Sequence, residues 1–453
     1  MIRLRRRFIY WLIKAYIKKW GRSILLYFII GLFAFFVLYL SFGFFLSNVQ
    51  IQKTETIGMV GAYNIDNLPS DILYKISRGL TFAAKDGTIR PDVATKWKIG
   101  NHGKTYVFYL RNDIYFSDGT NLTSDLIRYN FANLSVMRPN KYTIVYSLKD
   151  SYSPFLLTVS KPIFKKGLIG ISSYKIKDVK LNGNFVEYIN LVSKKGKKIS
   201  YQFYPTNSAL KTAFSLGEVS KVVGLPDVKF RNTTFYSFKN ARVEKEVDYQ
   251  KLAALFYNNQ DHVLSSKFLR EALSYTIPDN FSQGIRNSGP FSPFSFASQE
   301  TTDLYRQDIE HAKLLLDKAK SASEAASKIS LTIDTLPWYE STANSIAGIW
   351  KKLGISFKVK VTTKIPSSFQ VYLGEFNLSA DPDQYTLWHS DQPSNITNYN
   401  NLRVDKLLED GRKEIDIEKR KKIYAEFQKY ILSDPPASFL FFPYTFDVTR
   451  KSL

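Results

Sequence analysis

The residues most capable of chemistry in this sequence are few and stand far apart. The four histidines occupy positions 102, 262, 311 and 389, and cysteine is absent. A closely spaced pair of acids, Asp381 and Asp383, flanks Pro382. Such a pair could bind a hard cation through its oxygen atoms. A turn or helix cap around the proline needs no ligand, and we favour that interpretation.

The sequence also lacks the short motifs that mark several large enzyme classes. It contains no G-x-S-x-G, no Walker loop, no G-x-G-x-x-G and no H-E-x-x-H. The absence of cysteine excludes disulfides, thiol catalysis and lipidation on cysteine. We therefore expect a binding protein rather than an enzyme, and we predict neither a cofactor nor a metal site.

The charge of the chain is strongly positive but dispersed. The sequence has 63 Lys and Arg against 40 Asp and Glu, which gives a net charge of +23. A nucleic-acid-binding surface combines clustered basic and aromatic residues, whereas here acids are interspersed among the cations. The basic run at 194–198, KKGKK, lies between two alternating segments and is interpreted as the solvated tip of a hairpin. We expect no nucleic-acid partner.

An uncharged run organises the N-terminus. Residues 24–46, ILLYFIIGLFAFFVLYLSFGFFL, lie within a stretch without charge from Ser23 to Gln52. A helix of this length rises about 35 Å, enough for the ~30 Å hydrocarbon core of a bilayer. Eight cations and no acid precede the run, so the positive-inside rule places the N-terminus in the cytoplasm. We predict a cytoplasmic basic segment (1–23), a retained transmembrane helix (24–48) and an extracytoplasmic main domain on a single-pass protein of the cell membrane.

A cleaved signal peptide is the alternative for this N-terminus. Ser41-Phe42-Gly43 is a weak small-x-small cleavage site. The apolar run is longer than a usual signal core and the basic lead-in is long, which favours the anchor. Residues 8–17 are too short to span before Lys18, so we expect them to lie at the membrane interface.

The rest of the chain alternates between strand and helix signals. Residues 53–65 predict a first strand, and 123–131 predict a helix capped by Thr123. Asn182-Gly183 predicts a hairpin turn. The stretch 329–363 predicts a strand–helix–strand unit whose two strands run parallel.

Residues 76–129 carry the most specific pattern in the chain. Its members, in order, are Gly79-Leu80, Asp86-Gly87, Pro91-Asp92-Val93-Ala94, Trp97, Gly103-Lys104-Thr105-Tyr106, Phe108, Leu110-Arg111, Phe116-Ser117-Asp118-Gly119, Thr123 and Asp125. This order and spacing resembles extracellular solute-binding protein family 5, the peptide/nickel type of ABC-transporter substrate-binding protein that includes dipeptide and oligopeptide binders. The resemblance continues, more weakly, to about residue 445. Each of these residues is also explained by a turn, a cap or the core.

The resemblance implies an α/β fold. It is the periplasmic-binding-protein-like (type II) bilobal fold with a small extra lobe, here preceded by one N-terminal transmembrane helix. On this basis we expect a first lobe over 53–250 with an extra subdomain at about 85–168, a second lobe over 251–435, and a return to the first lobe over 436–453. The chain is shorter than the family leads us to expect, which implies trimmed loops or a smaller extra lobe.

The resemblance also implies a function and a site. Ligand would be trapped between two lobes that close about a hinge. The residues we expect near this cleft are Tyr63, Asn64, Tyr257, Asn258, Asn377, Asp381, Tyr385 and Trp388. The implied role is that of a membrane-anchored solute-binding protein that captures an oligopeptide-like ligand, or another small solute, for the permease of an ABC importer. A signalling or assembly ectodomain with the same fold and no transport role is the alternative.

One departure from the family pattern concerns the ligand's amino group. Peptide binders of the family often carry an acid just before the D-P-D stretch, and here Asn377, Leu378 and Ser379 stand at those positions. The resemblance therefore does not imply recognition of a free amine. Asp381 or Asp383 could take over that role if the loop turned either of them into the cleft.

Overall fold

The computed structural model of the protein describes residues 2–48, 54–84, 87–298, 305–322 and 329–451. The chain divides into two compact units, Met1–Thr54 and Glu55–Leu453. Asp86, in one of the predicted turns, lies outside the described residues.

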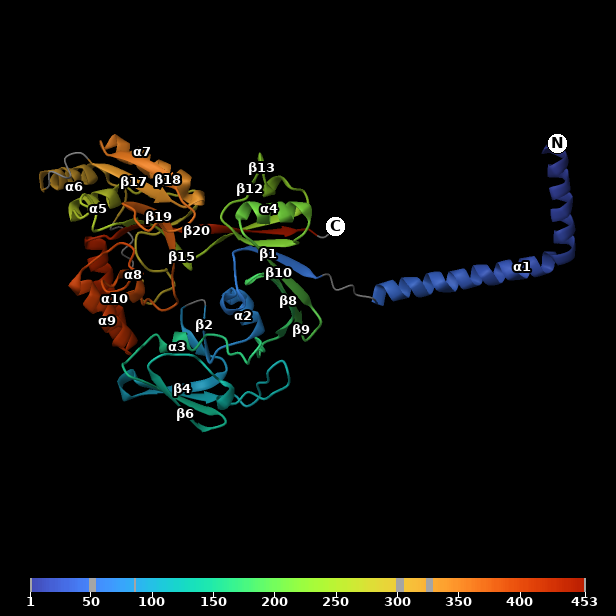
Figure 1. Ribbon diagram of the computed structural model, residues 1–453, viewed down its shortest axis with the longest axis horizontal. Helices are drawn as coiled ribbons and strands as arrows, with labels where there is room; N and C mark the ends of the chain where they lie inside the picture. The colour runs from blue at the N-terminus through green and yellow to red at the C-terminus, as the bar shows by residue number, and fades with distance from the viewer. Residues whose placement is uncertain (1, 49–53, 85–86, 299–304, 323–328, 452–453) are drawn as a thin grey trace. The chain divides into compact units, whose positions relative to one another are not determined.

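The first unit is built on one helix, α1, which runs from Ile2 to Asn48. It bends by 60° between an arm at Phe8–Ser23 and an arm at Leu25–Leu40 (Figure 1). Among the described residues, no single helix is long and apolar enough to cross a membrane, but these two arms together satisfy that test of length and composition. The predicted interfacial and membrane-spanning stretches thus share one bent helix, and retention in a membrane stays a prediction.

The second unit is built on a sheet of 12 strands in which the two lobes share one strand. The main order is β18-β17-β19-β15-β20-β11-β1-β10-β9-β8, and β14 and β16 also pair with β20. Strand β20 (Ala437–Arg450) pairs with β15 and β16 along its first half, and with β14 and β11 along its second half. Within residues 436–453, which we expected to return to the first lobe, β20 therefore begins in the second lobe and ends in the first.

The first lobe contains the half of the sheet that includes β1. Its strand β1 runs parallel to β10 and β11, and the Asn182-Gly183 turn joins β8 and β9 as an antiparallel hairpin, as predicted. The elements of this lobe are β1 (Glu55–Val60), α2 (Ser70–Ile76), β8 (Tyr174–Asn182), β9 (Phe185–Ser193), β10 (Lys198–Tyr204), α4 (Asn207–Leu216), β11 (Lys221–Leu225), β12 (Lys229–Phe230), β13 (Thr233–Thr234) and β14 (Ala241–Val247).

The second lobe contains the other half of the sheet with helices packed on it. The predicted strand–helix–strand unit is confirmed, because β17 and β18 pair in parallel and α7 connects them. The elements are β15 (Lys251–Tyr257), α5 (Lys267–Tyr275), β16 (Gly284–Arg286), α6 (Ile309–Ala322), β17 (Ser330–Thr335), α7 (Glu340–Lys352), β18 (Ser356–Val361), β19 (Val371–Asn377), α8 (Tyr385–Trp388), α9 (Leu402–Lys413) and α10 (Ile417–Ser433).

The extra lobe is a separate four-stranded antiparallel sheet, ordered β4-β5-β7-β6. A two-stranded hairpin and a one-turn helix accompany it (Figure 1). Its elements are β2 (Thr81–Ala83), β3 (Ile89–Pro91), β4 (Ala94–Gly100), β5 (Thr105–Leu110), β6 (Leu134–Asn140), β7 (Thr143–Leu148) and α3 (Phe155–Thr158).

The predicted helix over 123–131 is wrong. The structure has only a 3-10 turn at Ser124–Leu126. The guanidinium of Arg138 donates to the carbonyls of Ser124 and Ile127 at 2.9 and 3.0 Å, the acceptors that a continuing helix would need. The rings of Tyr129 and Phe131 stack at 5.1 Å and pack against the core of the extra lobe. Two such residues, i and i+2, face one side only when the backbone is extended.

The buried apolar residues form clusters that follow the three lobes. One cluster spans Leu252–Phe442, a second spans Leu80–Ile171, and two smaller clusters lie in the first lobe. These limits run close to the predicted lobe boundaries. The boundaries themselves stay predictions, since the chain from Glu55 onward forms one compact unit.

Candidate functional site

The carboxyl ends of the parallel strands of both lobes point toward the middle of β20. In the first lobe, Leu225 at the end of β11 lies opposite Phe446. In the second lobe, Asn377 at the end of β19 lies opposite Lys251 at the start of β15. Two residues later, Ala253 of β15 lies opposite Phe441 of β20, so the end of β19 also lies near the middle of β20. Ligands of open α/β sheets bind outside the carboxyl ends of such strands. The candidate site is therefore the region between the lobes beside residues 441–446.

Aromatic side chains lie where the chain crosses between the lobes. Tyr249, in the connection from β14 to β15, packs edge-on against Phe294 at 4.9 Å and lies 5.2 Å from Phe442. The ring of Phe294 is 50% exposed although it is large and apolar. In this group of three residues, here called the junction aromatics, Phe442 is buried and Phe294 presents an apolar surface beside the candidate site.

The two acids of the D-P-D segment are held by arginines of the following helices. Asp381 accepts from both terminal nitrogens of Arg420, on α10, at 2.8 and 2.9 Å. Their side chains are only 12% and 5% exposed. Asp383 accepts from Nε of Arg412, on α9, at 2.8 Å. Both carboxylates are therefore engaged in ion pairs.

Burial and pairing act against each other in these ion pairs. Burial raises the pKa of the Asp383 carboxyl, and the Arg412 guanidinium only partly opposes that rise. Burial alone would lower the pKa of the Arg420 guanidinium, but its bonds to Asp381 outweigh that effect and raise it. A charge in a low-dielectric site persists only when its partner remains in place.

A small cavity borders the D-P-D segment on the side of β19. It measures about 160 Å³ and is lined by Phe291, Ser292, Ser295, Asn377, Leu378, Ser379, Asp381, Pro382, Asp383, Gln384, Thr386 and Leu387. The polar atoms on its β19 side belong to the uncharged residues at 377–379, so no charge is presented there.

The extra lobe bonds to the second lobe at the end of α9. Ser151 donates its hydroxyl to the carbonyl of Lys413 at 2.6 Å. Ser153 donates its backbone N–H to the carbonyl of Arg412 at 2.7 Å and its hydroxyl to Gly411 at 3.2 Å. The last carbonyls of a helix lack partners within it, so these serines satisfy three of them. We call this arrangement the interlobe contact.

The tip of the β2–β3 hairpin is a second place where the extra lobe lies close to the second lobe. Gly87 has φ +76°, a conformation that favours glycine. A Cβ added there would lie 2.9 Å from the carbonyl oxygen of Phe294 and 3.8 Å from that of Ala380. The hairpin therefore packs closely against the second lobe, beside both the junction aromatics and the D-P-D segment.

Comparison with known protein families adds a decisive observation. The family model for bacterial extracellular solute-binding proteins, family 5 (middle region), matches residues 88–398. The chain belongs to family 5 of the bacterial extracellular solute-binding proteins. Members of this family bind peptides or small solutes and work with ABC transporters; it is a family of solute-binding proteins rather than of enzymes.

Relatives resemble this family 5 protein over most of its length at low identity. The probable D,D-dipeptide-binding periplasmic protein DdpA of Escherichia coli is 22% identical, over 84% of this chain and 85% of the relative. The oligopeptide-binding protein AppA of Bacillus subtilis is also 22% identical, over 84% and 83%.

Solved structures establish the fold of this family 5 protein. NikZ from Campylobacter jejuni, in complex with Ni(L-His), matches with a TM-score of 0.73 and 21% identity over 88% of this chain and 94% of that one. AppA from Bacillus subtilis, in complex with a nonapeptide, matches with a TM-score of 0.67 and 20% identity over 88% and 95%. The predicted type II bilobal α/β fold is thus confirmed.

The predicted first-lobe residues follow the carboxyl end of β1. Tyr63 is half-buried, with its ring 5.0 Å from that of Phe203 and its hydroxyl donating to the carbonyl of Val60 at 3.3 Å. Asn64 is exposed and caps the short turn Ile65–Asn67. In this family 5 protein both residues therefore lie at the edge of the first lobe that points toward the candidate site.

Two of the predicted second-lobe residues have structural partners instead. Tyr257 is fully buried, and its hydroxyl lies 2.6 Å from Oγ of Ser438. Asn258 donates to the carbonyl of Phe369 at 3.1 Å, and its Oδ1 accepts from the amide of Asn398 at 3.0 Å. These two side chains hold the end of β15 to its neighbours and do not reach the candidate site.

The four predicted residues at 377–388 divide between surface and core. Asn377 and Asp381 line the 160 Å³ cavity. Trp388 is fully buried, and its indole N–H donates to Gln384 at 2.8 Å. Tyr385 carries the guanidinium of Arg412 over its ring at 4.2 Å. Tyr385 therefore supports the ion pair between Asp383 and Arg412. Trp388 bonds to the residue that precedes its own helix, α8, and anchors that helix in the core.

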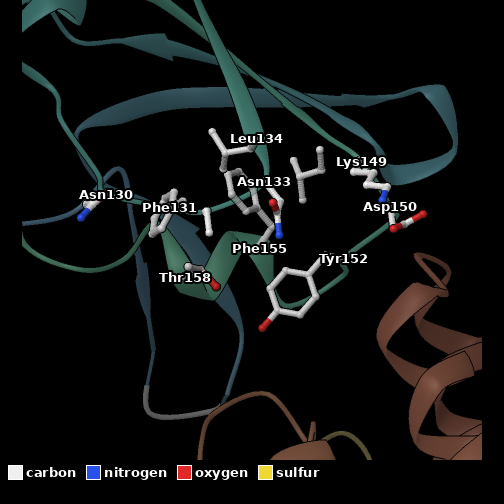
Figure 2. A pocket seen from close by; sticks show the side chains of 11 residues that line it. Asn130, Phe131, Asn133, Leu134, Lys149, Asp150, Tyr152, Phe155 and Thr158 are labelled. Atoms are coloured by element: carbon white, nitrogen blue, oxygen red, sulfur yellow. The ribbon is translucent and has the colours of Figure 1, made fainter.

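A second cavity lies within the extra lobe. Figure 2 shows the rings of Phe131, Tyr152 and Phe155 and the amide of Asn133 around it. Its volume is about 510 Å³, and residues 130–134 form one wall. The cavity thus adjoins the segment that was expected to continue as a helix. The ring of Tyr152 also lies 5.3 Å from the guanidinium of Arg412, which connects this wall to the interlobe contact.

The sequence prediction missed the partners of the two acids and the junction aromatics. Arg420 had a signal of its own, because it precedes Tyr424 and Phe427 at helical spacing on the buried face of α10. A cation on an otherwise apolar helix face predicts a buried acid as its partner. Phe294 had no comparable signal, since its place depends on the path of an irregular loop.

Proposed function

We propose that this family 5 protein is a membrane-anchored, extracytoplasmic receptor that captures oligopeptide-like ligands for an ABC importer. Support comes from the relatives named above, which include a probable D,D-dipeptide binder and an oligopeptide binder. The two helical arms, Phe8–Ser23 and Leu25–Leu40, and the eight cations that precede Ile24 support the anchor.

The observation that carries the peptide proposal is the chemistry at the end of β19. Uncharged Asn377, Leu378 and Ser379 border the cavity, while the nearest acids are engaged by Arg420 and Arg412. Such a surface presents uncharged polar groups rather than fixed charge. An extended peptide can pair with these groups as an added strand would. The junction aromatics would receive its apolar side chains.

Closure of the lobes is the expected response to ligand. Among the described residues, the chain passes between the first and second lobes in the connection around Tyr249 and in the middle of β20. A ligand that contacts both lobes biases an open–closed equilibrium toward the closed state. Scattering from the full-length protein should therefore report compaction when a peptide mixture is added.

The direct test uses full-length protein purified in detergent. Small molecules released on denaturation are identified by mass spectrometry, and melting temperature is recorded with synthetic peptides and, separately, with Ni²⁺ plus histidine. Peptides should be released, and saturating peptide should raise the melting temperature by a few degrees, since ligand at about 100 Kd adds about 2.7 kcal/mol of stability. A response to Ni²⁺ plus histidine alone would replace the peptide proposal with a metal-chelate one.

A matched pair of variants locates the site. Ser379→Trp places a large side chain in the cavity and should abolish the peptide response. Ser345→Trp makes the same change on the exposed face of α7 and should leave it intact. If neither ligand class gives a response and nothing is released, the importer proposal gives way to the assembly-ectodomain alternative.

A further inference from the structure

The edge of the first-lobe sheet opposite the candidate site gathers positive charge. Register places the start of β1 beside that of β10, the end of β9 beside the start of β8, and the end of β20 beside the starts of β11 and β14. In Figure 1 the start of β1 and the C-terminal end of β20 lie on the same side of this lobe. The cations at this edge, here called the basic edge, are Lys175, Lys194, Lys195, Lys197, Lys198, Lys221, Lys239, Arg242, Arg450 and Lys451.

Acids at this edge offset only part of its charge. Glu55 pairs with Lys197 at 3.1 Å, and Asp447 pairs with Lys221 at 2.9 Å. Arg242 and Glu244 pair at 2.8 Å. A fourth acid, Glu218, accepts from the hydroxyl of Tyr204 at 3.2 Å. Ten cations thus face four acids, so the edge keeps an excess of positive charge.

The excess charge is exposed to solvent. The turn at 194–198 joins β9 to β10, as the sequence predicts for a hairpin tip, and its four lysines are all exposed. Lys175, Lys239 and Lys451 are exposed as well, and the backbone N–H of Lys451 donates to the carbonyl of Asn240 at 2.8 Å. That bond holds the C-terminal lysine beside Lys239. The cations therefore form one surface rather than isolated side chains.

Chain length limits how far this surface can lie from the end of α1. Glu55 follows Asn48 by seven residues. Each residue spans at most about 3.6 Å, so Glu55 lies within about 25 Å of the end of the helix in any conformation. Because Glu55 begins β1, the chain joins the second unit to α1 at the basic edge.

We propose that the basic edge binds anionic lipid headgroups on the outer face of the membrane that holds α1. Lysines close to such a surface each add attraction that decays within a Debye length. The proposal rests on the membrane anchoring in the proposed function and adds a second membrane contact to it. Because strands β1, β10 and β11 begin at the basic edge and end toward the candidate site, this contact leaves the ligand site turned away from the lipid.

The test compares lysine reactivity in reconstituted full-length protein. Vesicles contain either phosphatidylcholine alone or phosphatidylcholine with about 30% phosphatidylglycerol, and an amine-acylating reagent is added outside. The labelling rate of Lys175, Lys194, Lys198 and Lys239 should fall at least threefold in the anionic vesicles. The rate should recover in about 0.5 M salt, which shortens the Debye length. The exposed lysines Lys96, Lys98 and Lys141 of the extra lobe should label equally in both vesicles.

Two charge-matched triple variants test whether the lipid contact is made by the basic edge. Removing three lysines of the turn, by Lys194→Gln, Lys195→Gln and Lys198→Gln together, should abolish the protection of Lys239. The matched triple variant Lys96→Gln, Lys98→Gln and Lys141→Gln should retain it.

If the protein stays in alkali-washed vesicles but labels equally with and without phosphatidylglycerol, the lipid contact is wrong and the anchor stands. If alkali releases the protein, the anchor is wrong and the lipid contact is overturned with it. Peptide binding is measured separately and does not depend on either result.

Discussion

The D-P-D segment and the basic edge both contain ion pairs, but they differ in how far water reaches their charges. At the D-P-D segment, Asp381 and Arg420 are 12% and 5% exposed and share two hydrogen bonds. At the basic edge, Glu55 and Lys197 are 36% and 59% exposed. Exposed pairs contribute about 0 to 1 kcal/mol, whereas breaking a buried pair costs about 3 to 5 kcal/mol. An acid–base pair therefore holds a loop in the first region, whereas in the second region the charged groups remain accessible to a partner.

The largest effect is expected where the buried pair is broken. Asp381→Asn leaves the guanidinium of Arg420 buried without its carboxylate, so we expect a loss of about 3 kcal/mol in the free energy of unfolding. Glu55→Gln makes the same chemical change at the basic edge and should cost less than about 0.5 kcal/mol. Denaturant unfolding of the full-length protein measures both. Equal losses would contradict the contrast between the two regions.

A somewhat smaller loss is expected from the second ion pair. Arg412→Met keeps most of the side-chain volume but leaves Asp383 buried without its cation and removes the cation over Tyr385. We expect a loss of about 2 kcal/mol at neutral pH, because Asp383 can take up a proton and become neutral.

The pH dependence of this variant provides its control. Burial already raises the pKa of Asp383 above the unfolded value of 3.8, and loss of Arg412 raises it further. The folded state then binds a proton more readily than the unfolded state, so stability is gained as pH falls through the raised pKa. The deficit of Arg412→Met should therefore shrink in acid. A deficit that grows as the pH falls would contradict the burial of an unpaired carboxyl.

Ligand binding should depend less on charge than stability does. With Asn377-Leu378-Ser379 at the site and both D-P-D acids engaged, N-acetylation of a bound peptide should change its affinity by less than tenfold, or about 1.4 kcal/mol. Calorimetry on one peptide and its acetylated form measures this. A greater loss, in a peptide whose acetyl group fits, would mean that an acid reaches the ligand's amine, and Asp381→Asn and Asp383→Asn would identify which.

The smallest effect is expected at an exposed acid of the extra lobe. The bond from Lys165 to Asp118, 2.6 Å long, lowers the pKa of this carboxyl to about 2. A carboxyl whose folded pKa is depressed contributes stability above its unfolded pKa, and this contribution is lost as pH falls from 3.8 to about 2. Asp118→Asn should thus be slightly less stable than the parent at pH 6 and equal to it below about pH 2. This is the opposite slope to that of Arg412→Met, and thermal melts across the pH range compare the two.

Local signals accounted for the parts of the fold that the sequence predicted correctly. Asn182-Gly183 marks a hairpin because glycine accepts φ +60° at its second position. The unit at 329–363 carries its own periodicity, and its parallel strands follow from the connecting helix. The helix expected at 123–131 failed because Arg138 and the burial of Tyr129 and Phe131 override local propensity.

The candidate site depends on contacts that no local pattern encodes. Asp381 and Arg420 are 39 positions apart, and Ser151 and Lys413 are 262 apart. A carboxylate in a sequence is equally compatible with a ligand contact and an ion pair, and only its surroundings decide between them. Tyr257 and Trp388 show the same limit for aromatic residues, since both end in the core.

Strand β20 has a consequence for how this protein matures after synthesis. It follows every other described strand in the chain, yet β11 and β14 of the first lobe and β15 and β16 of the second all pair with it. If the part of the chain after α1 crosses the membrane in sequence order, it presents four strands with an open edge until residues 437–450 have emerged. Such edges readily pair with other chains. Neither lobe can complete its sheet during translocation, so assembly of both must finish together at the end of export, and chaperones acting on the outer side would have their main task in that interval.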